Sequence, residues 1–147
     1  MKRTAIILVA ASVALGPALT AQEKQADPAA KGVAALQGTW AILTINGQSL
    51  ADSGTTMLFA ITGDKYAQTV NGEVNERGTI KVDQTKKPMT MHFTIAEGSD
   101  AGKPQVGLVE VTGDTMTMKL SQPGGATLPT SMAAEEGFFI VTAKKNK

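Results

Sequence analysis

The sequence predicts an all-β domain: an eight-stranded antiparallel up-and-down barrel, preceded by a short N-terminal helix. Three observations lead to this prediction. From Gly38 onward, runs of β-forming residues recur at spacings of roughly 8 to 12 residues. Turn residues separate these runs, and apolar and polar side chains alternate within several of them. No segment with helical periodicity lies between the runs, so the helical crossovers that parallel strands require are not expected.

The first 21 residues have the features of a cleavable leader. Lys2 and Arg3 precede an uncharged apolar stretch from Ala5 to Leu15, and small residues then lead to Ala21. This order is typical of a secretory signal peptide. The apolar stretch is also shorter than the roughly 20 residues that a membrane-spanning helix needs. We therefore expect cleavage after Ala21, a periplasmic or secreted location, and no membrane span in the remaining chain.

Composition narrows the classes of partner. The chain holds 14 basic and 13 acidic residues, and without Lys2 and Arg3 its formal net charge becomes −1. Proteins that bind nucleic acid usually carry a basic patch or stripe, so no nucleic-acid partner is expected. There is no cysteine, which excludes disulfides and a cysteine-linked lipid anchor. The domain over residues 36–147 must therefore rest on one continuous hydrophobic core.

Residues 22–35 are predicted to form a linker and a short helix. The segment is polar and rich in alanine, and it lacks the β-branched residues typical of strands until Val33. Asp27 suits the N-cap position and Pro28 the first helical position, so the helix is expected to continue from Ala29 to Leu36.

Each predicted strand is an apolar or β-branched run bounded by turn residues. Gly63-Asp64, Asn71-Gly72 and Gly113-Asp114 suit tight two-residue hairpins, which join neighbouring strands antiparallel. Longer connectors rich in Gly and Pro separate the other runs. The predicted strands are Thr39 to Asn46, Thr56 to Thr62, Lys65 to Val70, Val74 to Val82, Met89 to Ala96, Gln105 to Val111, Thr115 to Ser121 and Gly137 to Ala143.

Alternation indicates which face of each strand is buried. The strands at residues 89–96 and 115–121 alternate strictly, so each is expected to have one buried and one solvent-facing side. The strands at residues 56–62 and 137–143 are apolar on both sides. We expect the outer sides of those two strands to be covered by the N-terminal helix or by a partner.

Five short stretches together resemble a known family. Gly38-Thr39-Trp40 at the start of an eight-strand meander resembles the calycins, which are lipocalin-like barrels. The wider set resembles the uncharacterised lipocalin-like domains that are abundant in planctomycetes. The resemblance covers Leu36 to Lys145 and implies the fold, since that family has no established activity to transfer. The stretches are Leu36 to Trp40, Thr62 to Tyr66, Gly78 to Asp83 with Lys86 to Pro88, Glu97-Gly98 with Gly102-Lys103, and Thr112 to Met116.

The resemblance also implies how one end of the barrel is closed. In lipocalins the tryptophan packs against an arginine of the last strand, but this chain offers only Lys144 and Lys145 there. A lysine lacks the flat stacking surface of a guanidinium. We expect a barrel floor formed by Leu36, Gly38, Trp40 and a lysine stem, assigned to Lys144.

The barrel lumen is the candidate binding site. An eight-stranded barrel is just wide enough to be filled by side chains or to hold one small ligand, and both outcomes stay open. Methionine would give an adaptable lining. Glu110 is in phase with apolar residues of its strand, so it is expected to be a lumen carboxylate or to pair with Lys119. The candidate lumen residues are Met57, Phe59, Met89, Met91, Phe93, Met116, Met118 and Glu110.

No catalytic or metal-binding set can be assembled from the sequence. His92 is the only histidine, so no other residue could serve as the histidine base of a Ser-His-Asp triad. A zinc site with several histidine ligands is impossible for the same reason. His92 also points away from Met89 and Met91 on a strand, which disfavours a copper site. We expect a non-enzymatic binder of a small apolar or amphipathic ligand, without cofactor. The alternative is a solid-core structural or protein-interaction domain of the cell envelope, whose protein partner is unknown.

Overall fold

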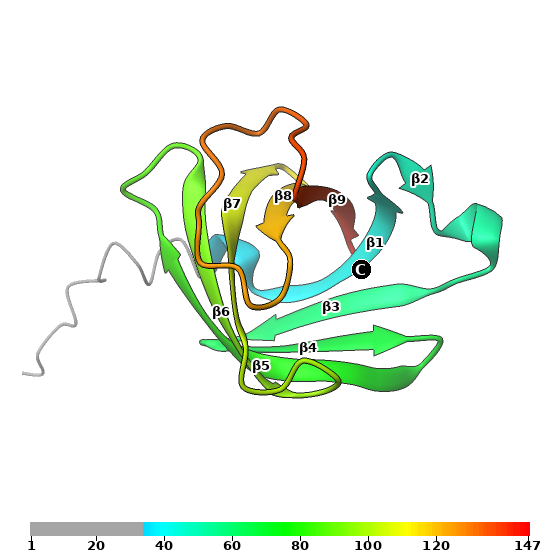
Figure 1. Cartoon of the computed structure of the whole chain (residues 1–147). Coiled ribbons are helices and arrows are strands. Elements are labelled where there is room, and N and C mark those ends of the chain that lie inside the picture. The colour runs from blue at the N-terminus through cyan, green and yellow to red at the C-terminus, as the bar shows by residue number, and fades with distance from the viewer. Residues whose placement is uncertain (1–33) are drawn as a thin grey trace, which may run out of the picture.

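The computed structural model describes residues 34–147, and these residues form a closed antiparallel barrel with one short extra strand (Figure 1). Residues 34–36 are helical and lead directly into β1. The strands are β1 Gly38–Ile45, β2 Gln48–Ser49, β3 Met57–Thr62, β4 Lys65–Val70, β5 Glu73–Asp83, β6 Met89–Glu97, β7 Pro104–Thr112, β8 Thr115–Ser121 and β9 Phe138–Lys145. The predicted leader, linker and helix start lie outside the described residues.

The predicted all-β class and the up-and-down order are confirmed. The sheet order is β2-β1-β3-β4-β5-β6-β7-β8-β9, and an antiparallel pairing of β1 with β9 closes it. All eight predicted strands are present, with ends that differ by at most two residues. The short β2 and the 3₁₀ turn Ala51–Ser53 were not predicted, and both lie in the connector between β1 and β3.

The core consists of side chains that point into the barrel, and these are every second residue along each strand. Met91, Phe93 and Ile95 of β6 are buried while His92 and Thr94 are exposed, as the alternation predicts. The core cluster consists of Leu36, Trp40, Ile42, Phe59, Ile61, Tyr66, Ile80, Val82, Met91, Phe93, Val109, Met116, Met118, Leu120, Val141 and Ala143.

The register shifts between β1 and β9, between β4 and β5, and between β5 and β6, and the first two shifts change which residues face the lumen near its open end. On β1, Ile42 pairs with Ala143 and Thr44 with Thr142, so Leu43 has no partner across the strand. On β5, Glu76 pairs with Gln68 and Val74 with Thr69, which leaves one further residue unpaired. Such β-bulges reverse the alternation beyond them. Leu43 and Val74, the large hydrophobic residues that are exposed in the described chain, both lie at these bulges.

Trp40 is buried near the end of the barrel at which β1 begins. Its indole Nε1 donates a 2.8 Å hydrogen bond to the carbonyl oxygen of Leu36, and both residues are fully buried. The cation on the ring, however, is Lys145 and not Lys144: Lys145 Nζ lies 4.7 Å from the Trp40 ring centroid and donates to the carbonyl of Gln37.

The pleat explains why the assignment to Lys144 was wrong. Trp40 and Lys145 are directly opposite across the β1–β9 ladder, so their side chains share the inner face, whereas Lys144 is exposed outside. Gly38 makes room for this lysine. Its φ of +110° suits glycine, and a Cβ there would lie 2.9 Å from Lys145 Cε.

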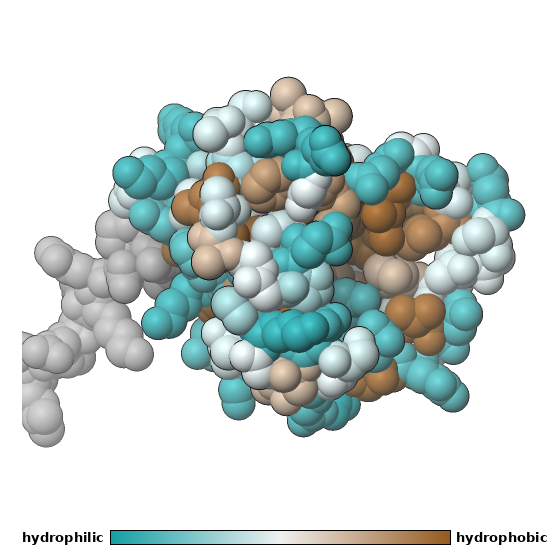
Figure 2. Space-filling model, in the orientation of Figure 1, coloured by the Kyte–Doolittle hydropathy of each residue, from teal (hydrophilic) through white to brown (hydrophobic). Residues whose placement is uncertain are grey.

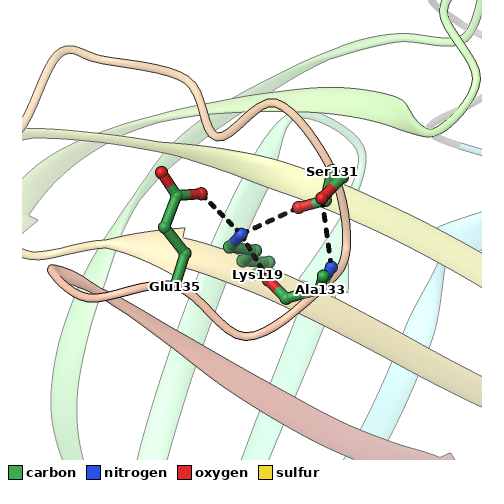
Figure 3. Close-up of polar contacts among 4 residues, drawn as sticks. All are labelled: Lys119, Ser131, Ala133 and Glu135. Atoms are coloured by element: carbon green, nitrogen blue, oxygen red, sulfur yellow. Dashed lines mark hydrogen bonds and ion pairs between the residues drawn. The ribbon is translucent and has the colours of Figure 1, made fainter.

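The outer face of β8 departs from the prediction. Lys119 alternates with buried Met118 and Leu120, and so was expected to face solvent, yet it is 0% exposed. The connector between β8 and β9, residues 122–137, runs over it (Figure 1). Lys119 Nζ donates to the carbonyls of Ser131 and Ala133 and to Glu135 Oε2, at 2.5 to 2.9 Å (Figure 3). These three acceptors match the three donors of an ammonium group.

This connector also explains why both expectations for Glu110 were wrong. Val106 and Leu108 lie on the outer face of β7 and are buried, whereas Glu110, on the same face, is exposed. The row of alternating apolar residues on β7 therefore lies on the outer face of the barrel, where it is covered, and does not face the lumen. Lys119 is paired with Glu135 instead of Glu110.

Lys145→Ala is expected to lower the free energy of unfolding by about 1–3 kcal/mol, because it removes the stem packed on Trp40 and a charged hydrogen-bond donor. Urea unfolding measures the change. Lys144→Ala is the matched control and should stay within about 0.5 kcal/mol of the unmodified protein, as exposed substitutions usually do. Equal losses in the two variants would contradict the assignment of Lys145 to the floor.

Lys119→Met should release residues 122–137 from the barrel wall. Methionine keeps an unbranched apolar stem but offers no donor to the carbonyls and carboxylate that Lys119 holds. Hydrogen–deuterium exchange followed by mass spectrometry should show faster exchange in this segment, with a global loss of about 1–3 kcal/mol. Lys81→Met, at an exposed position on β5, is the control. Unchanged exchange in the Lys119 variant would show that the ammonium does not hold the connector.

Candidate functional site

The candidate site is a cavity of about 170 Å³ in the lumen, at the end away from Trp40. This end is formed by the last residues of β1, the β4–β5 hairpin, the β6–β7 loop and the start of the β8–β9 connector. Figure 2 shows apolar side chains gathered between that connector and strands β1 to β4, within a surface that is otherwise largely polar. The cavity is lined by Ile42, Ile45, Met57, Phe59, Tyr66, Gln68, Glu76, Phe93, Gln105, Met118, Leu120, Pro123, Phe139 and Val141.

The predicted lumen residues are divided between the cavity and the solid part of the barrel. Met57, Phe59, Phe93 and Met118 line the cavity. Met91 and Met116 are fully buried and belong to the packed core. Met89 is half-buried at the opposite end, against Val109 and the β5–β6 connector. The two outcomes left open by the sequence, a filled lumen and a ligand cavity, thus each describe one part of this barrel.

The bulge on β1 builds one wall of the cavity. Strict alternation from Trp40 would place Ile42 and Thr44 inside. Because the register shifts after Ile42, the next residue that lines the cavity is Ile45. The bulge therefore brings a second isoleucine to the open end and turns Thr44 to the outside.

Three aromatic rings form a cluster beside the cavity. The centroids of Phe59 and Tyr66 are 5.3 Å apart, those of Tyr66 and Phe93 are 5.3 Å apart, and those of Phe59 and Phe93 are 6.2 Å apart. These distances are within the range of favourable tilted and edge-to-face contacts. The cluster supports both the core and the cavity wall.

The cavity also contains polar groups that the sequence analysis did not identify. Tyr66 Oη donates a 2.8 Å hydrogen bond to Glu76 Oε1, and Gln105 Nε2 donates to the carbonyl of Ser121 at 2.8 Å. Gln68 lies opposite both Glu76 and Phe59 in the sheet. The signal for Glu76 is present in the sequence, because it alternates in phase with the buried residues Ile80 and Val82.

Gly78 positions the Tyr66 ring. The two residues are paired across β4 and β5, and a Cβ at position 78 would overlap the carbonyl of Thr94 and lie 2.9 Å from Tyr66 Cε1. Glycine therefore leaves room for the phenol beside the β5 backbone, from where it reaches Glu76, two residues earlier on the same strand.

The Tyr66 phenol is held in its protonated form. Burial of Tyr66, which is 3% exposed, raises the pKa of its phenol far above the ordinary value of 10.0. The hydrogen bond to Glu76 and the negative charge of that carboxylate act in the same direction. The phenol thus stays protonated and acts as a hydrogen-bond donor.

Comparison of the chain with protein-family models, with curated proteins and with solved structures finds no match. In residues 34–147 the structure has no helix with the length and apolar character that a membrane crossing requires.

Alkaline titration provides a test of the Tyr66 environment, because Tyr66 is the only tyrosine of the chain. The folded protein holds the phenolic proton more tightly than the unfolded chain does. The associated stabilisation is complete below pH 10 and is lost as the pH rises above it. Tyrosinate absorbance should therefore be missing until the protein unfolds, while the urea-unfolded chain titrates near its ordinary pKa. Above pH 10 the unfolding free energy should fall more steeply than in Tyr66→Phe. A native tyrosinate transition near pH 10 would refute this environment.

Proposed function

We propose that this protein is a non-enzymatic binder of one small apolar or amphipathic ligand, which occupies the lumen cavity. The observation that carries the proposal is a cavity of about 170 Å³ with a largely apolar lining at one end of an otherwise packed barrel. An engineered apolar protein cavity of about 150 Å³ stays dry and takes up benzene. The volume therefore suits a ligand body the size of one ring, not a whole long-chain lipid.

The lining supports binding in preference to catalysis. The polar groups of the cavity are Tyr66, Gln68, Glu76 and Gln105, and the raised pKa of Tyr66 is the opposite of what a nucleophile or general base needs. His92 is exposed on the outer side of β6. The cavity groups can orient a ligand by hydrogen bonds, while Met57 and Met118 adapt to its shape.

The proposal includes export. Residues 1–21, which carry the signal-peptide pattern, predict a periplasmic or secreted protein in which the ligand would be met outside the cytoplasm. The resemblance to lipocalin-like domains is in keeping with such a role and stays a prediction.

Methionine methyl groups offer reporters at known places in the barrel. In ¹³C-methyl-methionine NMR spectra, benzene or xenon should shift the Met57 and Met118 signals saturably, because these residues line the cavity. The signal of Met89, at the other end, and that of Met132, in the β8–β9 connector, should not move. Trp40 fluorescence is a poor reporter, since Trp40 lies at the closed end.

A cavity-filling variant tests the location. Ile45→Phe adds volume at the cavity and should weaken or abolish the response, whereas Leu58→Phe, on the outer side of β3, should not. No saturable shift at Met57 and Met118 would contradict the proposal and favour the alternative, a solid-core structural or interaction domain.

A further inference from the structure

The single charged side chain among the residues that line the cavity is Glu76. It is half-buried on β5, and Tyr66 Oη donates to its Oε1. An ionised carboxylate has about four acceptor sites in total. One phenolic hydrogen bond therefore leaves acceptor capacity on a carboxylate that borders an apolar space.

No ion pair within residues 34–147 neutralises Glu76. The acidic partners in the ion pairs of this part of the chain are Glu97, Asp100, Glu135 and Asp114, held by Arg77, Lys103, Lys119 and Lys147. Arg77, the neighbour of Glu76 on β5, points to the outside and pairs with Glu97 at 3.3 Å. Charged side chains that are partly removed from water are stabilised by a charge of the opposite sign, so a positively charged group in this cavity would have Glu76 as its partner.

The surroundings of Glu76 suit an organic cation more than a hydrated metal ion. Phe59, Tyr66, Phe93 and Phe139 supply aromatic rings to the lining, and Met57 and Met118 supply polarizable thioethers. Ring faces attract ammonium groups, and an aromatic lining with a carboxylate is a general means of recognising amines. Divalent metal ions would need several oxygen or nitrogen ligands, and the described chain has no cluster of three acidic or histidine residues.

We propose that the ligand is a small organic ammonium ion with a one-ring or short alkyl body, its cationic nitrogen bound at Glu76 and its apolar part beside the Phe59–Tyr66–Phe93 cluster. This inference rests on the proposed function and specifies its ligand class. It also predicts discrimination: a carboxylate ligand such as a fatty acid would place two negative charges close together in a partly dehydrated space.

Three ligands of nearly equal size separate charge from shape: benzylammonium, benzyl alcohol and benzoate. Titrations at physiological salt, read from the Met57 and Met118 methyl signals, should give a dissociation constant for benzylammonium at least tenfold lower than that for benzyl alcohol. Benzoate should bind most weakly. This comparison uses the unmodified protein, so it does not depend on how any variant folds.

The matched variants are Glu76→Gln and Glu73→Gln, which remove the same charge from the same strand. Glu73 is exposed and does not line the cavity. Glu76→Gln keeps an acceptor for Tyr66 and should reduce benzylammonium binding to the level of benzyl alcohol. Glu73→Gln should leave the tenfold preference intact.

The outcomes distinguish this inference from the proposed function. Saturable binding of all three ligands with similar affinity, or a benzylammonium preference that survives in Glu76→Gln, would overturn the assignment of the cation site while the cavity remains a binding site. If benzene, xenon and all three ligands leave Met57 and Met118 unmoved, the proposed function fails together with this inference.

Discussion

The pairing of β1 with β9 is the constraint on which the rest of the structure depends. Since β1 also pairs with β3, this second ladder closes the sheet into a barrel and gives every strand an inner and an outer face. The interior of such a barrel is narrow, so one row of side chains per strand nearly fills it. Closure also sets Lys145 opposite Trp40, which seals the end at which β1 enters. The cavity lies at the opposite, open end of the barrel.

Bulges decide how that open end is built. A strand that followed strict alternation would bring Thr44 inside β1 and Val74 inside β5. The register shifts place Ile45 at the cavity, turn Thr44 outward, and leave Leu43 and Val74 exposed. Bulges raise local twist and re-aim side chains, and they are common beside functional sites and at barrel rims. The exposure of Leu43 and Val74 is thus the local cost of shaping the rim, and it is confined to the shifts on β1 and β5.

The sequence predicted the fold well because strand identity depends on local signals. Alternation and turn residues placed all eight strands and part of the core, including Met91, Phe93, Met116 and Met118. The burial of outward-facing residues was predicted less well, because it depends on which distant segment packs over them. Lys119 and Glu110 are both polar residues in outer rows, but only Lys119 lies under the β8–β9 connector, and no local pattern reveals where a connector will run. The choice between Lys144 and Lys145 depended on the β1–β9 register. Glu76 was missed although its phase with Ile80 was visible, because the mixed pattern of β4 gave no reason to place Tyr66 beside it.

Around the Tyr66–Glu76 pair, three residues depart from the ordinary packing of a barrel core. A carboxylate occupies an inner row, a phenol is buried with its proton retained, and Gly78 lies in a central strand at a position where a Cβ would collide with Thr94 and Tyr66. Each feature alone would weaken a barrel core, since buried polar groups are unfavourable unless they are hydrogen-bonded. Together they are mutually dependent: Gly78 admits the ring, the ring brings Oη to Glu76, and the hydrogen bond supports the carboxylate. Natural proteins depart from consistent packing mainly at functional sites. A solid core would be served better by apolar residues at positions 66 and 76, so the cluster is best explained by what the carboxylate can bind.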